Sequence, residues 1–244
     1  MFQPLKKLDL RLKSINIITG EGAHANLFSS NDYSIGKRTI NLVDAGEQKE
    51  IHHLVSVFEQ LHLSVDNLTS VIITHSHDDH WEGVKTLLRL VPLQIMVFED
   101  DIPYYQQELK RLNNTLEYHL RGLSDGEFIE VENHRLQVLH TPGHDSGSIC
   151  LYDATNRILF SGDTVFASGT TGSLRSGNLA DLARSLRRLT MLDVDILLPG
   201  HGDLALKNGN KAIQLALERL TWLDRLPDDA PYWMKIRRSQ HKSS

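Results

Sequence analysis

The sequence predicts an α/β protein in which helices cover stacked β-sheets. Short runs rich in Ile, Val and Leu, bounded by Gly, Pro, Asp or Asn, have the composition and length of buried strands. They alternate with segments in which apolar residues recur at helical spacing. Near residues 14–44 and 127–161, strand-like runs also follow one another directly. This mixture indicates sheets whose outer faces are covered by helices.

The expected strands and helices can be placed in chain order. The strand-like runs are SINII (14–18), RTINLVD (38–44), VIIT (71–74), QIMVFE (94–99), HRLQVLH (134–140), SICLYD (148–153), RILFS (157–161) and DILLP (195–199). The helical patterns cover residues 47–61, 82–91, 103–112, 178–191 and 209–226. The helix at 178–191 is the most regular, because leucines recur along one face and Asn178 is a suitable N-cap.

The composition is that of an ordinary globular chain. Of the 244 residues, 40% are apolar and 23% charged. The net charge of −5 argues against a nucleic-acid partner. The single cysteine, Cys150, excludes an intrachain disulfide and fits a reducing compartment. No apolar run approaches the ~20 residues of a membrane span, and the N-terminus lacks a signal-peptide core. We therefore expect a soluble, cytoplasmic protein with no membrane partner.

Four strand-like runs each lead to a side chain that can bind a metal ion. VIIT leads to His75, HRLQVLH leads through TPG to His144, RILFS leads through Gly to Asp163, and DILLP leads through Gly to His201. Ligands in α/β sheets gather beyond the carboxyl ends of strands. Glycine directly precedes three of these residues, where a tight turn can aim the next side chain inward. The pattern predicts a site for more than one metal ion.

The segment HSHDDH concentrates three histidines and two aspartates at residues 75–80. His75 and His77 are two residues apart, so on extended backbone they share a face and can hold one ion. Asp79 and His80 follow as the chain turns toward the next helix, and they can hold a second ion nearby. Imidazole and carboxylate ligands suit zinc, with iron or manganese as alternatives. A cysteine-rich structural zinc site is disfavoured, because these motifs contain no cysteine and the chain has only one.

These motifs resemble those of the metallo-β-lactamase superfamily. Its HxHxDH signature corresponds to residues 75–80, and TPGH with His144, SGDT with Asp163 and PGHG with His201 follow in the family's order. LVDAG, with Asp44, resembles the strand-end aspartate behind the family's metal centre, although a turn-capping role for Asp44 is equally open. The resemblance covers about residues 14–203. It implies a four-layer αββα sandwich, with residues 1–205 as the catalytic domain and residues 206–244 as a C-terminal helix and tail packed on it.

The resemblance also implies a dinuclear centre with two zinc ions per chain. The implied ligands of the first ion are His75, His77 and His144. Those of the second ion are Asp79, His80 and His201, with Asp163 bridging the two. Asp79 would in addition be the catalytic residue that orients the nucleophile and passes a proton to the leaving group. The implied reaction is hydrolysis by a hydroxide held between the two ions.

A small-molecule ester, lactone or thioester is the expected substrate. SGDTVF resembles the corresponding segment of the glyoxalase II branch, including Phe166, whereas lactonases commonly carry a tyrosine there. The following ASGTTGSLRSGN departs from the glyoxalase II pattern, and the C-terminal part is too short for that branch's glutathione-binding domain. Arg175 is either a contact for an anionic substrate group or a solvated loop charge, and Trp81 either walls the pocket or packs in the core.

Two other functions within the superfamily remain as alternatives. A mononuclear-iron, persulfide dioxygenase-like oxidoreductase is disfavoured, because that branch uses fewer ligands and all seven positions are intact here. A phosphodiesterase or nuclease is disfavoured by the acidic charge balance and by the short segment between Asp163 and His201. The helix at 209–226 and the aromatic residues Tyr232 and Trp233 leave open whether the C-terminus forms a lid or a homodimer contact.

Overall fold

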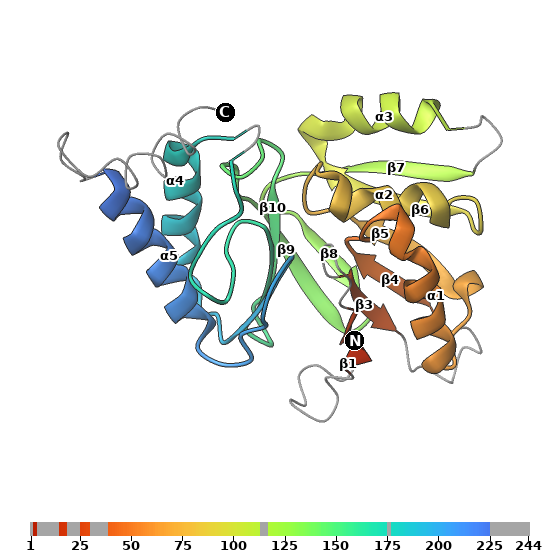
Figure 1. The fold of residues 1–244 in the computed structure, drawn as a ribbon, viewed down its shortest axis with the longest axis horizontal. Helices are drawn as coiled ribbons and strands as arrows, with labels where there is room; N and C mark the ends of the chain where they lie inside the picture. Colours follow the sequence, from red (N-terminus) through yellow and green to blue (C-terminus); the bar gives the residue numbers. More distant parts are fainter. Residues whose placement is uncertain are drawn as a thin grey trace. The chain divides into compact units, whose positions relative to one another are not determined.

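A computed structural model describes residues 2–3, 15–18, 25–29, 39–112, 117–174 and 177–224. The chain divides into two compact units, Met1–Leu136 and Gln137–Ser244 (Figure 1). The proposed boundary at residues 205/206 therefore stays a prediction. Arg175 and the aromatic residues Tyr232 and Trp233 lie outside the described residues. Among the helices that the structure describes, none is long and apolar enough to cross a membrane.

The first sheet has seven strands in the order β1-β2-β3-β4-β5-β6-β7. Their bounds are Phe2–Gln3, Ile15–Ile18, Ala25–Ser29, Ile40–Val43, Leu68–Ile72, Leu93–Phe98 and Tyr118–Leu123. Strands β1 to β4 pair in antiparallel fashion, and β4 to β7 pair in parallel. Parallel neighbours need crossover connections. Helices α1, α2 and α3 provide those connections between β4, β5, β6 and β7.

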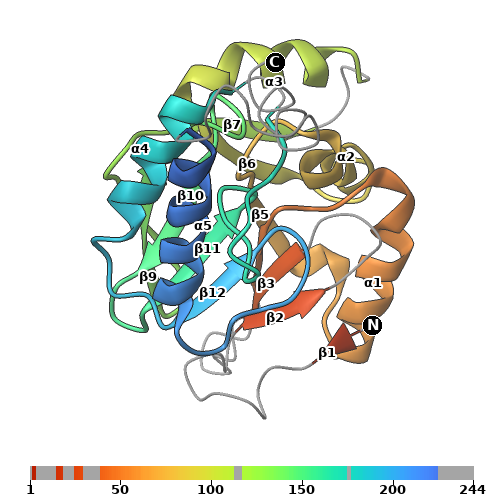
Figure 2. The ribbon, with the colours of Figure 1, turned by 60° about the vertical axis from the view of Figure 1, so that its left-hand side comes forward.

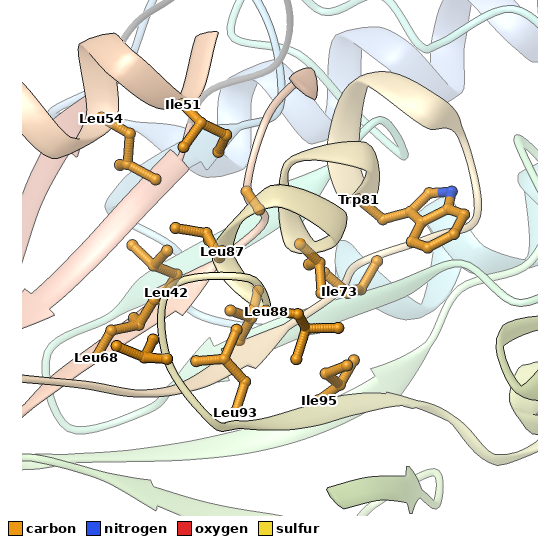
Figure 3. Close-up of a cluster of buried hydrophobic side chains, with 14 of the residues drawn as sticks. Leu42, Ile51, Leu54, Leu68, Ile73, Trp81, Leu87, Leu88, Leu93 and Ile95 are labelled. Carbon is orange, nitrogen blue, oxygen red and sulfur yellow. The ribbon is translucent and has the colours of Figure 1, made fainter. Parts of the chain in front are cut away.

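The core of the first unit lies between the parallel strands and these helices, α1 (Ile51–Gln60), α2 (Asp78–Leu87) and α3 (Ile102–Lys110). Leu42 and Ile95 from the sheet and Leu54 and Leu87 from the helices are at most 3% exposed and belong to one buried cluster (Figure 3). Trp81 is also buried in this cluster, edge-on to Tyr105. Of its two predicted roles, core packing is the one observed.

The second sheet has the strand order β12-β11-β10-β9-β8. The bounds are Ile196–Pro199 for β12, Ile158–Gly162 for β11, Ile149–Asp153 for β10, His134–His140 for β9 and Phe128–Val131 for β8. Strands β10 and β11 are antiparallel, whereas β11 and β12 are parallel. Helices α4 (Leu179–Leu189) and α5 (Gly209–Asp224) lie side by side (Figure 2). Their apolar residues share one buried cluster with β9 to β12.

Most expected elements are present, with corrections at their ends. Asn178 caps α4 as predicted, because its side-chain oxygen accepts the backbone N–H of Asp181 at 2.9 Å. The helix expected at 82–91 instead begins at Asp78 and ends at Leu87. The strand expected at 71–74 is β5 at Leu68–Ile72. Strands β1, β3, β7 and β8 are absent from the prediction. Strand β7 contains Gly122 and β8 contains Glu130, residue types that are depleted in strands.

Candidate metal centre

The predicted ligand segment HSHDDH spans the connection from β5 to α2. The chain bends at residues 74–76 and α2 starts at Asp78, so His75 does not lie on extended strand as predicted. Nε2 of His75 nevertheless lies 3.1 Å from Nδ1 of His77. Two imidazole nitrogens on one tetrahedral zinc ion, each with a bond of ~2.0–2.1 Å, are roughly 3.3 Å apart. The spacing of these two nitrogens therefore suits ligands of a single ion.

His80 and Asp79 lie in the first turn of α2. The His80 side chain is fully buried, and its ring centroid is 4.0 Å from that of His75. The Asp79 carboxylate is partly exposed, with Oδ2 4.0 Å from Nε2 of His80. Acidic side chains are stabilised in the first turn of a helix, where backbone N–H groups point outward. The first unit thus brings His75, His77 and His80 together and places Asp79 at their edge.

Asp44 fixes the orientation of His80 from behind. Its Oδ2 lies 2.8 Å from Nδ1 of His80 and also accepts the Thr74 hydroxyl at 2.9 Å. Its Oδ1 accepts the Thr74 backbone N–H at 2.8 Å. A carboxylate can only accept, so Nδ1 of His80 carries the proton and Nε2 keeps the lone pair that a metal ion needs. Asp44 thus contacts a predicted metal ligand, as the orienting role of the two proposed for it requires.

Close packing holds the start of α2 against the loop after β4. The Ala45 N–H donates to the His80 carbonyl at 2.8 Å, and the Gly83 N–H donates to the Gly46 carbonyl at 2.9 Å. A Cβ at Gly83 would lie only 2.4 Å from the Ala45 carbonyl oxygen. Glycine at position 83 therefore allows the helix that carries Asp79 and His80 to approach the loop that carries Asp44. The sequence around Gly83, HWEG, does not by itself predict this close approach.

The second unit contains the other three predicted ligands. His144 follows β9, Asp163 follows β11 and His201 follows β12. Oδ2 of Asp163 lies 3.5 Å from Nε2 of His144 and 3.5 Å from Nε2 of His201. His144 and Asp163 are buried, and His201 is partly exposed. A single carboxylate oxygen equidistant from two imidazole nitrogens is the arrangement expected of a shared ligand.

Glycine 172 supports His144 from the segment that departs from the glyoxalase II pattern. A Cβ at this position would lie 2.4 Å from Nδ1 of His144. The Gly172 N–H donates to the Asp163 carbonyl at 2.8 Å. Any larger residue at position 172 would displace the imidazole ring. The glycine-rich segment therefore has a structural role next to two predicted ligands, which sequence reasoning missed.

Cys150 takes no part in this chemistry. It is fully buried in β10, where burial raises the pKa of its thiol to about 11. The nucleophilic thiolate is therefore scarce near neutral pH. Cys150 is a core residue of the second unit.

The chain matches one family of known proteins over most of its length. Residues 26–201 match the family model of the metallo-beta-lactamase superfamily. The chain belongs to this superfamily. The superfamily match and the solved structures confirm the predicted αββα fold class. Membership also identifies the chain as a metallo-hydrolase-superfamily protein whose histidine and aspartate groups could hold metal ions.

Similar proteins include one curated enzyme and several solved metallo-β-lactamase folds. An atrochrysone carboxyl ACP thioesterase of Aspergillus fumigatus is 27% identical, over 84% of this chain and 60% of its own length. This chain thus spans about three fifths of that relative. A metallo-beta-lactamase family protein from Thermus thermophilus superposes with a TM-score of 0.68 at 21% identity, covering 86% of this chain and 80% of the other. The subclass B3 metallo-beta-lactamase BJP-1 of Bradyrhizobium japonicum gives 0.65 at 16% identity, covering 87% and 90%.

Proposed function

We propose that this metallo-β-lactamase superfamily member is a metal-dependent hydrolase of small-molecule esters, lactones or thioesters, with thioesters favoured. The observation that carries the proposal is Oδ2 of Asp163, placed 3.5 Å from a nitrogen of both His144 and His201. A carboxylate oxygen at this position could serve as a metal ligand shared between the sites of the two imidazoles. The likeness to a carboxyl ACP thioesterase supports the choice of thioesters.

Each unit carries a set of donors that is proposed to bind metal ions. The first set is His75, His77, Asp79 and His80, and the second is His144, Asp163 and His201. Two zinc ions suit this combination of imidazole and carboxylate, with iron or manganese as alternatives. Bound metal ions would supply an acidified water and polarise the carbonyl oxygen of the substrate.

Asp79 is proposed as the residue that moves the proton. Its side chain is 32% exposed, so solvent and substrate can reach it, and its Oδ2 is 4.0 Å from Nε2 of His80. A partly exposed carboxylate can accept a proton from the attacking water and release it to the leaving group. A thiolate leaving group needs this proton less than an alkoxide does, because thiols are stronger acids. A variant such as Asp79→Asn should therefore lose more activity on oxygen esters than on thioesters.

Phe166 favours thioesters and simple esters over lactones. Its ring stands edge-on to that of His201, with centroids 6.1 Å apart. It lies next to a proposed ligand but has no hydroxyl with which to donate to a substrate carbonyl. A lactonase-like tyrosine would provide that donor, so Phe166→Tyr should raise lactone turnover relative to thioester turnover.

The test is a substrate screen on protein of known metal content. Metal-free protein is reconstituted separately with zinc, iron or manganese and assayed on thioesters, oxygen esters, lactones, phosphodiesters and β-lactams. We expect thioesters to be cleaved fastest, and Asp163→Asn to lower turnover by orders of magnitude. The exposed substitution Asp100→Asn on the first unit is the matched control and should leave turnover unchanged. One iron per chain with oxygen consumption on persulfides, or no effect of Asp163→Asn, would overturn the proposal.

A further inference from the structure

A pocket of about 490 Å³ opens beside His201 within the second unit. Two loops line it: residues 166–168 after β11 and residues 201–205 after β12. Its volume lies within the range of roughly 300–1,000 Å³ that small-molecule sites occupy. Because a proposed metal ligand lies in its wall, a molecule in this pocket would have one end next to the reacting group.

The chemistry of the lining is mostly apolar. Phe166, Ala167, Leu204 and Ala205 supply hydrocarbon surface, and Asp203 supplies a carboxylate. Within the described part of the chain, neither Lys nor Arg lines this pocket. The pocket therefore offers a hydrocarbon chain apolar contact surface, and the Asp203 carboxylate in its lining repels a second anion.

Both loops are held in place by hydrogen bonds. Ala205 exchanges backbone hydrogen bonds with Leu197, at 2.8 and 3.1 Å. The Phe166 N–H donates to the Thr170 carbonyl at 2.8 Å, which closes the other loop. Nη1 of Arg219, on α5, donates to the carbonyls of Ser168 at 2.8 Å and Gly169 at 2.7 Å. A pocket held in this way needs little reorganisation on binding.

We propose that this pocket holds the uncharged hydrocarbon acyl chain of the substrate, and that Asp203 disfavours substrates that carry a carboxylate on that chain. The inference rests on the proposed function, which puts the scissile carbonyl near His201. The acyl part is chosen over the thiol part because the amide-rich thiol carriers of natural thioesters match an apolar lining poorly. The predicted substrate class is therefore the neutral medium-chain acyl thioester.

The first measurement is a chain-length series on the metal-reconstituted enzyme. The substrates are butyryl, hexanoyl, octanoyl and decanoyl thioesters of N-acetylcysteamine, and released thiol is followed. We expect kcat/KM to rise by up to about three- to four-fold per added methylene until the pocket is full. Ala167→Leu, which narrows the pocket, should shift the optimum to a shorter chain. A series with no dependence on length would overturn the apolar assignment.

The second measurement separates charge from length. Hexanoyl and adipoyl thioesters have six-carbon acyl chains and differ by a terminal carboxylate. We expect the hexanoyl substrate to be preferred, and Asp203→Lys to shift the preference toward the adipoyl substrate by about ten-fold at low ionic strength and less in salt. Glu59→Lys makes the same charge change on an exposed position of α1, in the first unit, and should leave the preference unchanged. An equal shift in both variants would overturn the role of Asp203.

A binding measurement distinguishes failure of this inference from failure of the proposed function. Hexanamide and adipamic acid are matched, non-hydrolysed probes whose binding can be followed by ligand-observed NMR. We expect hexanamide to bind more tightly, and Ala167→Leu to weaken its binding. If no thioester is cleaved but hexanamide binds in this way, the hydrolase proposal fails while the pocket assignment stands. If thioesters are cleaved but neither probe discriminates the variants, the pocket assignment fails alone.

Discussion

The Asp44 carboxylate lies 2.8 Å from Nδ1 of His80, although Asp44 belongs to the loop after β4 and His80 to helix α2. Both side chains are buried, so the hydrogen bond is shielded from water. Asp44 adopts a left-handed backbone conformation with φ of 60°, which only short polar residues and glycine adopt readily. The fold therefore maintains an unusual backbone geometry at the residue that orients a proposed metal ligand.

Replacing Asp44 by Asn should weaken metal binding while preserving the fold. Asn also tolerates the left-handed conformation, but its single oxygen replaces only one of the two carboxylate oxygens, so either the Thr74 backbone N–H or Nδ1 of His80 loses its acceptor. Loss of such an orienting partner typically costs about 10- to 100-fold in metal affinity. Competition against a chromogenic chelator measures the metal affinity, and the exposed substitution Asp100→Asn is the control. Equal metal retention by the two variants would show that Asp44 does not orient His80.

Substitution of Gly172 by Ala should also lower metal affinity, through His144. The added Cβ would lie 2.4 Å from Nδ1 of His144, so the imidazole must shift from its present position relative to Oδ2 of Asp163. We expect a loss of at least about ten-fold in metal affinity, comparable to the loss of an orienting partner. Gly126→Ala is the control, because its φ of 81° strains alanine but nothing lies within 4 Å of the added carbon. If Gly126→Ala alone lowers stability and neither variant loses metal, the contact with His144 is unimportant.

Three of the predicted ligands could be found from sequence because each occupies the same kind of position in the chain. His144, Asp163 and His201 directly follow a glycine at a strand end, and that local pattern is visible without any tertiary structure. The parallel strands and the α4 leucine pattern were predictable for the same reason. The start of α2 was missed because HSHDDH looks like a polar loop, although acidic residues in a first helical turn were a usable signal.

The supporting residues could not be found in this way. Asp44 and His80 are far apart in sequence, and nothing local distinguishes an aspartate that orients a histidine from one that caps a turn. Gly172 looks like any loop glycine until the position of the His144 ring is known. Close approaches and long-range hydrogen bonds depend on how loops pack, and sequence periodicity carries no information about that packing.

Arg219 should matter for substrate binding even though it is exposed and on α5. Its guanidinium donates to the carbonyls of Ser168 and Gly169 in the loop that carries Phe166. Arg219→Met keeps the aliphatic stem but removes both hydrogen bonds, at a cost of about 1 kcal/mol in unfolding free energy for an exposed site. The more specific expectation is a higher KM for long acyl chains with kcat little changed, measured on the N-acetylcysteamine thioesters. Arg187→Met, at an exposed position of α4, is the control. An equal change in KM in both variants would show that the hydrogen bonds of Arg219 do not affect substrate binding.

The buried thiol of Cys150 should make the protein less stable at high pH. Burial raises its pKa from 9.0 to about 11, so the folded state keeps the proton over a range in which the unfolded chain loses it. Stability from this group is therefore complete below pH 9 and falls as the pH rises from 9 to 11. Each pKa unit corresponds to about 1.4 kcal/mol, so the loss should approach roughly 2–3 kcal/mol. Urea unfolding of the wild type and of Cys150→Ala between pH 8 and 11 measures this loss of unfolding free energy. Because the variant lacks the ionisable group, its unfolding free energy should decline less steeply with pH. Parallel declines in the two proteins would assign the pH dependence to other groups.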